Sequence, residues 1–324
     1  MSRQTVLGKG PIGRTLARHL ADAGHEVRVL SRSGPRPGTP ARTTTAAGGS
    51  IEHHRVDGTD AGALVRHAQG AQALYNCVNP AYHRWVTDWP PVADALLTAA
   101  ERTGAVLVTA ANLYVYGAGN RHMHEDDPLA TRETKGRVRA QMWHDALARH
   151  EAGALRATEV RGSDYLGPGA EAHAHAGPRM LAPLLAGRTV RPIGSADQPH
   201  TWTYLPDFAA ALAAAATTPD AWGRPWHVPS PEPLTFRSLV TRFARAAGVP
   251  VPRIAPVPMA AVRAVGLVQP MLREVAAIAY QFTEPFVADD TASRRALGLE
   301  PTDWDTVVAT TLAAYRAETP GRAA

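Results

Sequence analysis

The stretch "QTVLGKGPIGRTLARHLADAG", residues 4–24, decides how the chain begins to fold. It opens with a short run that ends in apolar residues and stops at a glycine. The apolar residues Ile12, Leu16 and Leu20 then recur at helical spacing, and Gly24 follows as a stop signal. The pattern predicts a strand that passes through a glycine-rich turn directly into an amphipathic helix.

The turn has the spacing G-x-G-x-x-G. The first glycine allows a tight turn, the second lets the backbone approach a pyrophosphate, and the third lets helix and strand pack closely. The helix N-terminus adds amide donors and partial positive charge. We therefore predict a dinucleotide site, although a purely structural turn is the alternative. The residues assigned to it are Gly8, Lys9, Gly10, Pro11, Ile12 and Gly13.

Strand and helix signals alternate through the first half of the chain. Strand patterns cover residues 25–32, 50–60, 71–80 and 105–117, and helical patterns cover 61–70, 92–104 and 132–150. Such alternation predicts an α/β fold with a doubly wound parallel sheet of the Rossmann type. We assign residues 1–165 to a dinucleotide-binding domain and 166–324 mainly to a smaller substrate-binding cap, with a segment near 197–230 returning to the sheet. Residues 32–49 read as a low-complexity surface loop.

Composition excludes several classes of function. The net charge of +5 is scattered without a basic run, so no nucleic-acid partner is expected. No apolar run approaches the ~20 residues of a membrane span, no signal peptide precedes the first strand, and a single cysteine fits a reducing compartment. We expect a cytoplasmic protein. His122, His124, His173 and His175 are closely spaced but lie in loop-like segments, without a helical i, i+4 register or a paired cysteine, so no metal is expected.

The residues after the second strand bear on the choice of cofactor. Ser31 and Arg32 stand where an acidic residue would bind the ribose 2′-hydroxyl of NAD. An arginine there can pair with a 2′-phosphate, which favours NADP, and Lys9 offers a second cation. The alternative is that Arg32 is only solvated and Lys9 only a turn residue. Asp57 is a candidate for the adenine amino group or a helix cap, and Asn79 ends the strand expected near the nicotinamide.

Four further motifs carry a resemblance to a known family. They are "AVLVTAANLYVYG" at 105–117, "EDDPLATRETKGRVRAQ" at 125–141, "RGSDYLGPG" at 161–169 and "QPHTWTYLPDFAAAL" at 198–212. With the glycine turn, and in this order, they make the chain resemble the extended short-chain dehydrogenase/reductase superfamily, of the NAD-dependent epimerase/dehydratase type. The resemblance covers nearly the whole chain. It implies a nicotinamide dinucleotide, a small-molecule substrate and a homodimer.

The chain departs from the family pattern in three places. Its glycine spacing is one residue tighter than usual, which indicates an atypical branch. In the family, the tyrosine of Y-x-x-x-K is the acid/base and the lysine binds the nicotinamide ribose. Lys135 matches the lysine, but Thr131 stands in place of the tyrosine, and its hydroxyl is far too weak an acid to replace a phenol. Asn112 replaces the family's Ser or Thr. A surface lysine is the alternative for Lys135.

Another proton donor is then required. Tyr114 is the first candidate because it lies two residues beyond Asn112, so an extended backbone would point both side chains the same way. Tyr82 and His83 come next, and Asn112 can donate a hydrogen bond to a carbonyl oxygen. Tyr165 is expected to line the substrate cleft, or only to pack.

These observations favour an NADP-dependent oxidoreductase that transfers hydride to or from a carbonyl or imine of a small molecule. A nucleotide-sugar epimerase or dehydratase is one alternative, and a non-catalytic NADP-binding redox sensor is another. Helices 92–104 and 136–150 are expected to pair two subunits, with Met142, Trp143 and Leu147 either at that interface or facing the sheet.

Overall fold

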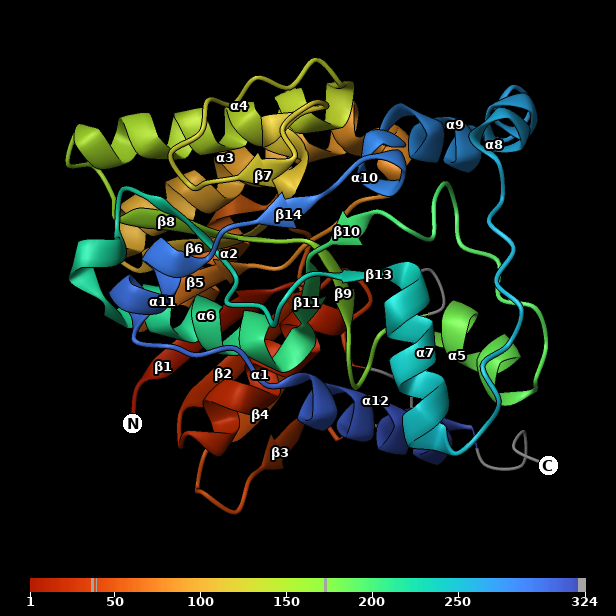
Figure 1. Ribbon diagram of the computed structural model, residues 1–324. Coiled ribbons are helices and arrows are strands. Elements are labelled where there is room, and N and C mark those ends of the chain that lie inside the picture. Colours follow the sequence, from red (N-terminus) through yellow and green to blue (C-terminus); the bar gives the residue numbers. More distant parts are fainter. Residues whose placement is uncertain (36–37, 39, 172–173, 320–324) are drawn as a thin grey trace.

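One eight-stranded sheet forms the centre of the molecule (Figure 1). The computed structural model describes residues 1–319 apart from 36–37, 39 and 172–173. The strand order is β12-β8-β6-β5-β1-β2-β4-β3, and every neighbouring pair is parallel except β3 with β4. The strands are β1 (Arg3–Leu7), β2 (Glu26–Ser31), β3 (Arg42–Thr44), β4 (Ser50–Arg55), β5 (Ala71–Asn76), β6 (Val106–Asn112), β8 (Ala157–Gly162) and β12 (Pro225–His227).

The chain builds this sheet outward in both directions from β1. It runs first through β2 to β4 and then returns beside β1 to run through β5, β6 and β8. The strand order therefore reverses between β1 and β5, and ligands of such sheets bind at the carboxyl ends of the strands beside that point. The predicted doubly wound parallel sheet is confirmed.

Helices cover both faces of the sheet (Figure 1). One face carries α2 (Ala61–Ala68), α3 (Trp85–Thr103) and α4 (Thr134–Glu151), and the other carries α1 (Pro11–Asp22), α6 (Leu205–Thr217) and α11 (Thr291–Leu297). Each face buries its own apolar cluster, so the sheet is sandwiched between two cores. Trp85 and Trp89 of α3 are almost fully buried, and this helix begins seven residues before the predicted helix 92–104.

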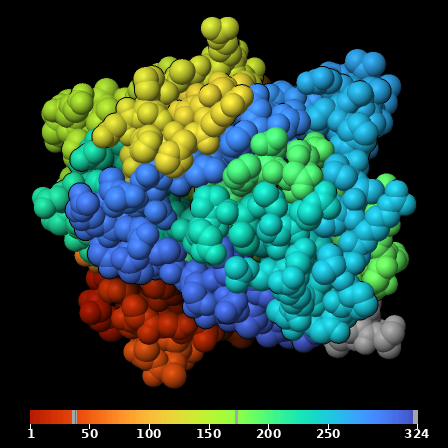
Figure 2. Space-filling view, viewed as in Figure 1, coloured from red at the N-terminus to blue at the C-terminus, as the bar shows by residue number. Residues whose placement is uncertain are grey.

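A second group of elements, called the cap below, packs beside the carboxyl ends of the strands. Its helices are α5 (Pro178–Leu185), α7 (Phe236–Ala247), α8 (Met259–Gly266), α9 (Pro270–Ala277), α10 (Tyr280–Thr283) and α12 (Trp304–Glu318). Two short strand pairs join it, β9 (Asp164–Leu166) with β11 (Trp202–Tyr204) and β10 (Pro199–His200) with β13 (Leu234–Thr235). In Figure 2 this later part of the chain forms most of the face in view, with the first fifty residues at the lower edge.

The remaining elements are short, and two predicted segments differ from the structure. They are β7 (His122–Met123), β14 (Val287–Ala288), η1 (Tyr82–Arg84), η2 (Leu113–Tyr116) and η3 (Pro219–Ala221). The predicted loop 32–49 contains β3, because its threonine run pairs with the open edge of β4. The predicted strand 105–117 ends at Asn112, where the chain turns into the 3-10 helix η2.

A buried polar chain ties the sheet to the C-terminal segment. Arg161 pairs with Glu159 at 2.7 Å and donates to the Tyr116 hydroxyl at 2.8 Å. That hydroxyl donates to His227 Nε2 at 2.7 Å, and His227 Nδ1 donates to the Asp289 carbonyl at 2.6 Å. Burial lowers the pKa of His227 to about 3, so the ring is neutral and can accept at Nε2. In this series the Tyr116 hydroxyl both accepts and donates, and both ring nitrogens of His227 are hydrogen-bonded.

None of the helices in the described part of the chain combines the length and apolarity needed to cross a bilayer.

Candidate functional site

A cavity of about 640 Å³ opens at the carboxyl ends of the sheet strands. Its walls include the last residues of β1, β2, β6 and β8 and the segments that follow β4 and β5. The N-terminal part of α3 closes one side, and the cap closes another. The cavity therefore lies at the reversal of strand order, where the fold places a ligand.

The glycine turn forms one end of this cavity. Gly8 has a φ of +112°, and a Cβ there would collide with the backbone of Cys77. A Cβ on Gly13 would collide with the Gly8 carbonyl, so this glycine lies beneath the turn and not in the cavity wall. Both glycines are required by close backbone packing.

Gly10 is different, and it gives a test of whether a dinucleotide fits. Its φ of −66° suits any residue, and a Cβ on it would meet no protein atom within 4 Å. The missing side chain therefore leaves room in the cavity itself. Helix α1 begins at Pro11 without a side-chain cap, so its first amides are available to a ligand. This cradle fits a pyrophosphate, and Lys9, Pro11 and Ile12 line it as well.

The next part of the wall follows β2 and β4. Ser31 and Arg32 both line the cavity, and Arg32 is exposed and makes no hydrogen bond or ion pair within the described residues. The Lys9 ammonium donates to the Gly34 carbonyl at 2.7 Å, which ties the glycine turn to the loop after β2. Lys9 is therefore not free to approach a phosphate without giving up this bond.

Asp57 also lines the cavity, but it does not cap a helix. Its Oδ1 accepts from the amide and the hydroxyl of Thr59, both at 3.0 Å, and these bonds, with a smaller contribution from Arg32, lower the pKa of Asp57. Helix α2 is capped by Asp60 instead. The helix-cap alternative for Asp57 is wrong.

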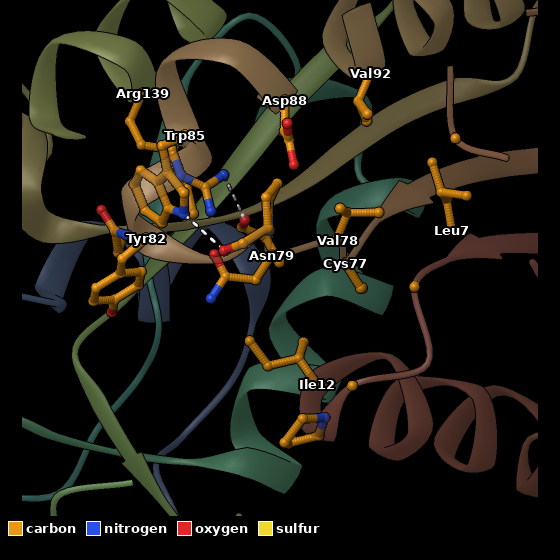
Figure 3. Close-up of a pocket in the computed structure, with 18 of the residues that line it drawn as sticks. Leu7, Ile12, Cys77, Val78, Asn79, Tyr82, Trp85, Asp88, Val92 and Arg139 are labelled. Carbon is orange, nitrogen blue, oxygen red and sulfur yellow. Dashed lines mark hydrogen bonds between the residues drawn. The ribbon is translucent and has the colours of Figure 1, made fainter. Parts of the chain in front are cut away.

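Two phenols meet at the other end of the cavity. The hydroxyls of Tyr82, on η1, and Tyr114, on η2, lie 3.1 Å apart, and both residues line the cavity. Burial raises the pKa of Tyr82 and raises that of Tyr114 well above its ordinary value. Both phenols are therefore neutral at pH 7. Figure 3 shows Tyr82 close to Trp85 and Asn79, which also face the cavity.

The predicted extended backbone from Asn112 to Tyr114 is wrong, because η2 begins at Leu113, but Tyr114 does line the cavity. The Asn112 side chain accepts from the Tyr114 amide at 3.2 Å and so caps η2. Asn112 lines the cavity too.

Lys135 is buried behind the cavity wall. Its side chain is 2% exposed and does not line the cavity. The ammonium pairs with the carboxylate of Glu274 on α9, donates to the Glu274 carbonyl at 3.1 Å, and lies 5.4 Å from the centre of the Tyr82 ring. In the structure Lys135 links α4 to the cap through Glu274. The surface-lysine alternative is wrong, because the side chain is buried.

Of the other predicted site residues, some line the cavity and some do not. Tyr165 lines the cavity, while Thr131 and His83 do not. The Thr131 hydroxyl donates to Glu133 at 2.7 Å, in the segment that leads into α4, and His83 is exposed on η1. Neither of these two side chains is placed to meet a ligand in this cavity.

The cation on α4 that reaches the cavity is Arg139, one turn beyond Lys135. Figure 3 shows Arg139 beside Trp85, and its guanidinium lies 4.9 Å from the Trp85 ring centre. The guanidinium also lies 4.3 Å from the Trp89 ring centre, and Nη1 donates to the Ala110 carbonyl at 3.4 Å. Nε has no partner within the described residues. Burial lowers the pKa of Arg139 to about 10, which leaves it charged at pH 7. Arg139 is thus a buried cation to which no carboxylate of the described residues is hydrogen-bonded.

Sequence reasoning missed Arg139, although a signal for it exists. Lys135 and Arg139 have the same four-residue spacing as Y-x-x-x-K. In that register, Lys135 stands in place of the tyrosine and Arg139 in place of the lysine. Asp164 and Gln281, which also line the cavity, were missed as well. Asp164 lies inside the motif "RGSDYLGPG", whereas nothing in the sequence near Gln281 indicated a site.

The histidines do not form a metal site in the described residues. The rings of His122 and His124 meet edge to face, each 4.0 Å from the Asp289 carboxylate, and His175 is buried against Trp202. His173 lies outside the described residues. No group of three potential ligands gathers within residues 1–319 as described.

The match to a known family agrees with this geometry. Residues 5–228 match the family described as "NAD dependent epimerase/dehydratase family", and the chain belongs to this family. None of the curated proteins compared with the chain matches it.

Solved structures share the fold at low sequence identity. MoeE5 in complex with UDP-glucose and NAD has a TM-score of 0.77 and 20% identity, covering 98% of this chain and 99% of its own. UDP-glucuronic acid 4-epimerase from Bacillus cereus, in complex with NAD, has a TM-score of 0.75 and 14% identity over 98% and 99%. UDP-N-acetylglucosamine 4-epimerase from Methanobrevibacter ruminantium M1, in complex with UDP-N-acetylmuramic acid, has 0.77 and 14% over the same shares. At these identities the likeness establishes the fold.

Proposed function

We propose that the protein binds a nicotinamide dinucleotide and transfers hydride between it and a carbonyl, alcohol or imine carbon of a small molecule. The observation that carries this proposal is a single cavity with the Gly10 cradle at one end and the Tyr82–Tyr114 phenol pair at the other. Membership of the family supports it. The bound dinucleotide would supply or accept the hydride, and the protein would supply position and protons.

The preferred dinucleotide is NADP. Ser31 and Arg32 line the cavity after β2, and no carboxylate occupies either position. A charge-assisted contact to the 2′-phosphate is worth ~1.5–3 kcal/mol, or roughly 10- to 150-fold in affinity. Calorimetric titration of the wild type and Arg32→Ala with NADP and NAD tests this preference. Arg32→Ala should lose NADP affinity by that factor and keep NAD affinity, whereas equal wild-type affinities would contradict it.

The phenol pair favours proton donation, and hence reduction. When hydride adds to a carbonyl carbon, the oxygen becomes an alkoxide that must take a proton. Burial raises the pKa of Tyr82 and of Tyr114, so each holds its proton at neutral pH. Tyr82 is the less buried of the two, and its hydroxyl contacts that of Tyr114. We assign Tyr82 as the donor and Tyr114 as its hydrogen-bond partner.

Arg139 is the cation at this end of the cavity. Stacking on Trp85 and Trp89 fixes the plane of its guanidinium, so the group is pre-organised. We assign it to the ribose or carbonyl oxygen beside the phenols, in the role first predicted for Lys135. A cation beside a developing alkoxide stabilises that charge.

A nucleotide-sugar epimerase is the second candidate, and the solved structures similar to this chain favour it. That reaction needs a diphosphate site on the cap side of the cavity. Arg179, Arg188 and Arg191, the cap cations noted in the sequence, are exposed and do not line the cavity. A redox sensor has less support, because it needs neither a phenol pair nor a buried guanidinium in the cavity.

NADPH oxidation against a panel of aldehydes, ketones and imines tests the first candidate. Stoichiometric oxidation with one of them is expected, with a rate that Tyr82→Phe lowers. Interconversion of UDP-glucose and its 4-epimer without net oxidation would instead support the second candidate. Tight NADP binding without either activity would support the sensor.

We also propose that two subunits pair through α3 and α4. Trp143 is buried against the sheet, so it is not part of such an interface, while Met142 and Leu147 are half-buried. On this face Arg149 joins α4 to Asp94 and Glu101 of α3. Light scattering should give twice the 34.5 kDa of one chain, and a mass near 34.5 kDa at micromolar concentration would contradict pairing.

A further inference from the structure

Two short cap helices carry apolar side chains into solvent. α8 and α9 project together from the cap, at the upper right of Figure 1, and no residue of α9 is buried. Leu267 and Val268, in the turn between them, are 77% and 84% exposed. Of the seven large apolar side chains that are exposed in the described residues, four lie within residues 265–271. Single exposed apolar side chains are ordinary, whereas such a group marks an interaction surface, here called the apolar tip (Val265, Leu267, Val268 and Met271).

The hairpin of α8 and α9 holds the apolar tip out from the body of the molecule. The two helices pack closely, since a Cβ on Gly266 would lie 3.0 Å from the backbone nitrogen of Arg273. The Arg273 guanidinium closes the turn by donating to the carbonyls of Gly266 and Leu267 at 3.2 and 3.0 Å. At the base of the hairpin, Glu274 pairs with the buried ammonium of Lys135 on α4. The tip is therefore a preformed projection, and a partner does not have to order it.

The hairpin and the segment that leads into it are positively charged. Residues 251–277 contain Arg253, Arg263 and Arg273, with Glu274 as the only acid among them. Glu274 is paired with Lys135, so its charge does not offset the arginines. Arg253 and Arg263 are exposed, and their side chains make no hydrogen bond or ion pair within the described residues. Apolar side chains and unpaired cations therefore occur together on this part of the cap.

The positive charge continues along the edge of the cap that leads to α8. Residues 190–193, after α5, pair in parallel with residues 254–257 through two isolated bridges. This pairing brings Arg188 and Arg191 alongside the segment that contains Arg253 (Figure 1). Arg188 and Arg191 are exposed and, like Arg253, do not line the cavity. This row of cations therefore faces solvent and not the proposed cofactor site.

We propose that the apolar tip docks on a bilayer that contains anionic lipid, with the arginines of this cap edge at the headgroups. Such a surface binds through apolar side chains that enter the interface and through cations that meet anionic headgroups. α8 and α9 have eight residues each, against the ~20 of a membrane span, so the hairpin lies in the interface and does not cross. A second copy of the chain fits less well, because symmetric pairing sets the same arginines against each other. Docking does not depend on the proposed hydride transfer.

Sedimentation of the whole chain with sucrose-loaded vesicles tests the docking. Vesicles of phosphatidylcholine alone are compared with mixed vesicles, which contain phosphatidylcholine and phosphatidylserine in equal amounts. An arginine near an anionic surface contributes about fivefold in affinity, so two of them at the headgroups predict at least about 25-fold tighter binding to the mixed vesicles. High salt should remove most of this preference, because it screens charges outside the bilayer.

Two variants separate the apolar contribution from the charged one. Leu267→Ser with Val268→Ser changes only exposed side chains, so the fold should be retained, while binding to mixed vesicles should fall at least about tenfold. Arg263→Gln should lower binding to mixed vesicles about fivefold and leave binding to phosphatidylcholine unchanged. Val86→Ser is the matched control, since Val86 is an exposed valine on α3, outside the tip, and this variant should bind like the wild type.

Absence of binding to mixed vesicles would overturn the proposal, and so would unchanged binding after Leu267→Ser with Val268→Ser or an equal loss in Val86→Ser. Light scattering covers the second copy, because a mass below that of the wild type in the double variant would assign the tip to contacts between subunits instead. The wild-type comparison of the two kinds of vesicle needs no variant, so the test stands even if the double variant folds poorly. NADPH affinity is measured separately by its fluorescence, and a failure there contradicts the proposed hydride transfer and not the docking.

Discussion

Gly10→Ala separates ligand binding from folding at the glycine turn. The φ of −66° at Gly10 is open to alanine, and the new methyl would meet no protein atom within 4 Å. Alanine restricts the unfolded chain, which stabilises by ~0.4–1 kcal/mol, but it is a poorer N-cap than glycine by a similar amount. The two effects nearly cancel, so the free energy of unfolding should change by no more than about 0.5 kcal/mol.

Cofactor binding should respond differently, because the methyl occupies the cradle. If a pyrophosphate lies against Gly10, the methyl pushes it away from the first amides of α1. Loss of about one charged hydrogen bond costs ~1.5–3 kcal/mol, or at least roughly 10-fold in affinity. The expected variant is as stable as the wild type and binds NADPH at least ten times more weakly.

Gly13→Ala is the matched control. A methyl there collides with the Gly8 carbonyl, which is backbone and cannot rotate away. Overpacking of this kind costs ~1–3 kcal/mol or more, so this variant should lose stability as well as affinity. Urea unfolding and NADPH fluorescence titration measure both quantities for both variants. Wild-type affinity in Gly10→Ala would refute the cradle, and a large loss of stability there would refute the geometry of the turn.

Three further perturbations address other parts of the molecule. Tyr82→Phe should slow single-turnover reduction by ~10²–10⁴ and leave NADPH affinity unchanged; a mild loss of rate would assign the proton donor to another residue. Because burial raises the pKa of Tyr82, the wild-type rate should stay constant through neutral pH and fall only above the ordinary pKa range of tyrosine. Lys135→Met should lower the free energy of unfolding by about 2 kcal/mol, which is less than the ~3–5 kcal/mol expected for a fully buried ion pair because Glu274 is partly exposed. The double variant Lys135→Met with Glu274→Gln should recover part of this loss. A tenfold loss of NADPH affinity in the single variant would show that Lys135 does bind the cofactor. Burial lowers the pKa of His227 to about 3, so below about pH 6.5 the unfolded chain takes up a proton that the folded chain does not. The free energy of unfolding should therefore fall by ~2 kcal/mol from about pH 7.5 to about pH 5. Urea unfolding of His227→Gln at both pH values should show a smaller fall, and an equal fall would assign the titration to other groups.

Local patterns were enough to predict the architecture of the nucleotide half. The order of strands and helices follows from the periodicity of apolar residues, which each segment carries by itself. The glycine turn was predicted for the same reason, because the collisions that exclude a side chain at Gly8 and Gly13 arise within one strand–turn–helix unit and its neighbouring strand. The position of Ser31 and Arg32 at the end of the second strand likewise predicted that they line the cavity.

The polar end of the cavity depended on contacts between distant segments. Lys135 and Arg139 lie only about 6 Å apart along α4, and the sequence does not say which of the two turns faces the cavity. Tertiary contacts decide which residue faces the cavity. Glu274, 139 residues further along the chain, binds Lys135, and the guanidinium of Arg139 stacks on Trp85 and Trp89.

The same holds for the groups around the phenols. Tyr114 reaches Tyr82 because the backbone leaves β6 for a 3-10 helix, and a strand-like run of residues does not reveal where it stops. Asp164, on β9, and His200, on β10, come within 3.0 Å of each other only through the packing of the cap. Periodicity reports which face of an element is buried, whereas the partner of a buried charge depends on how the elements pack against one another.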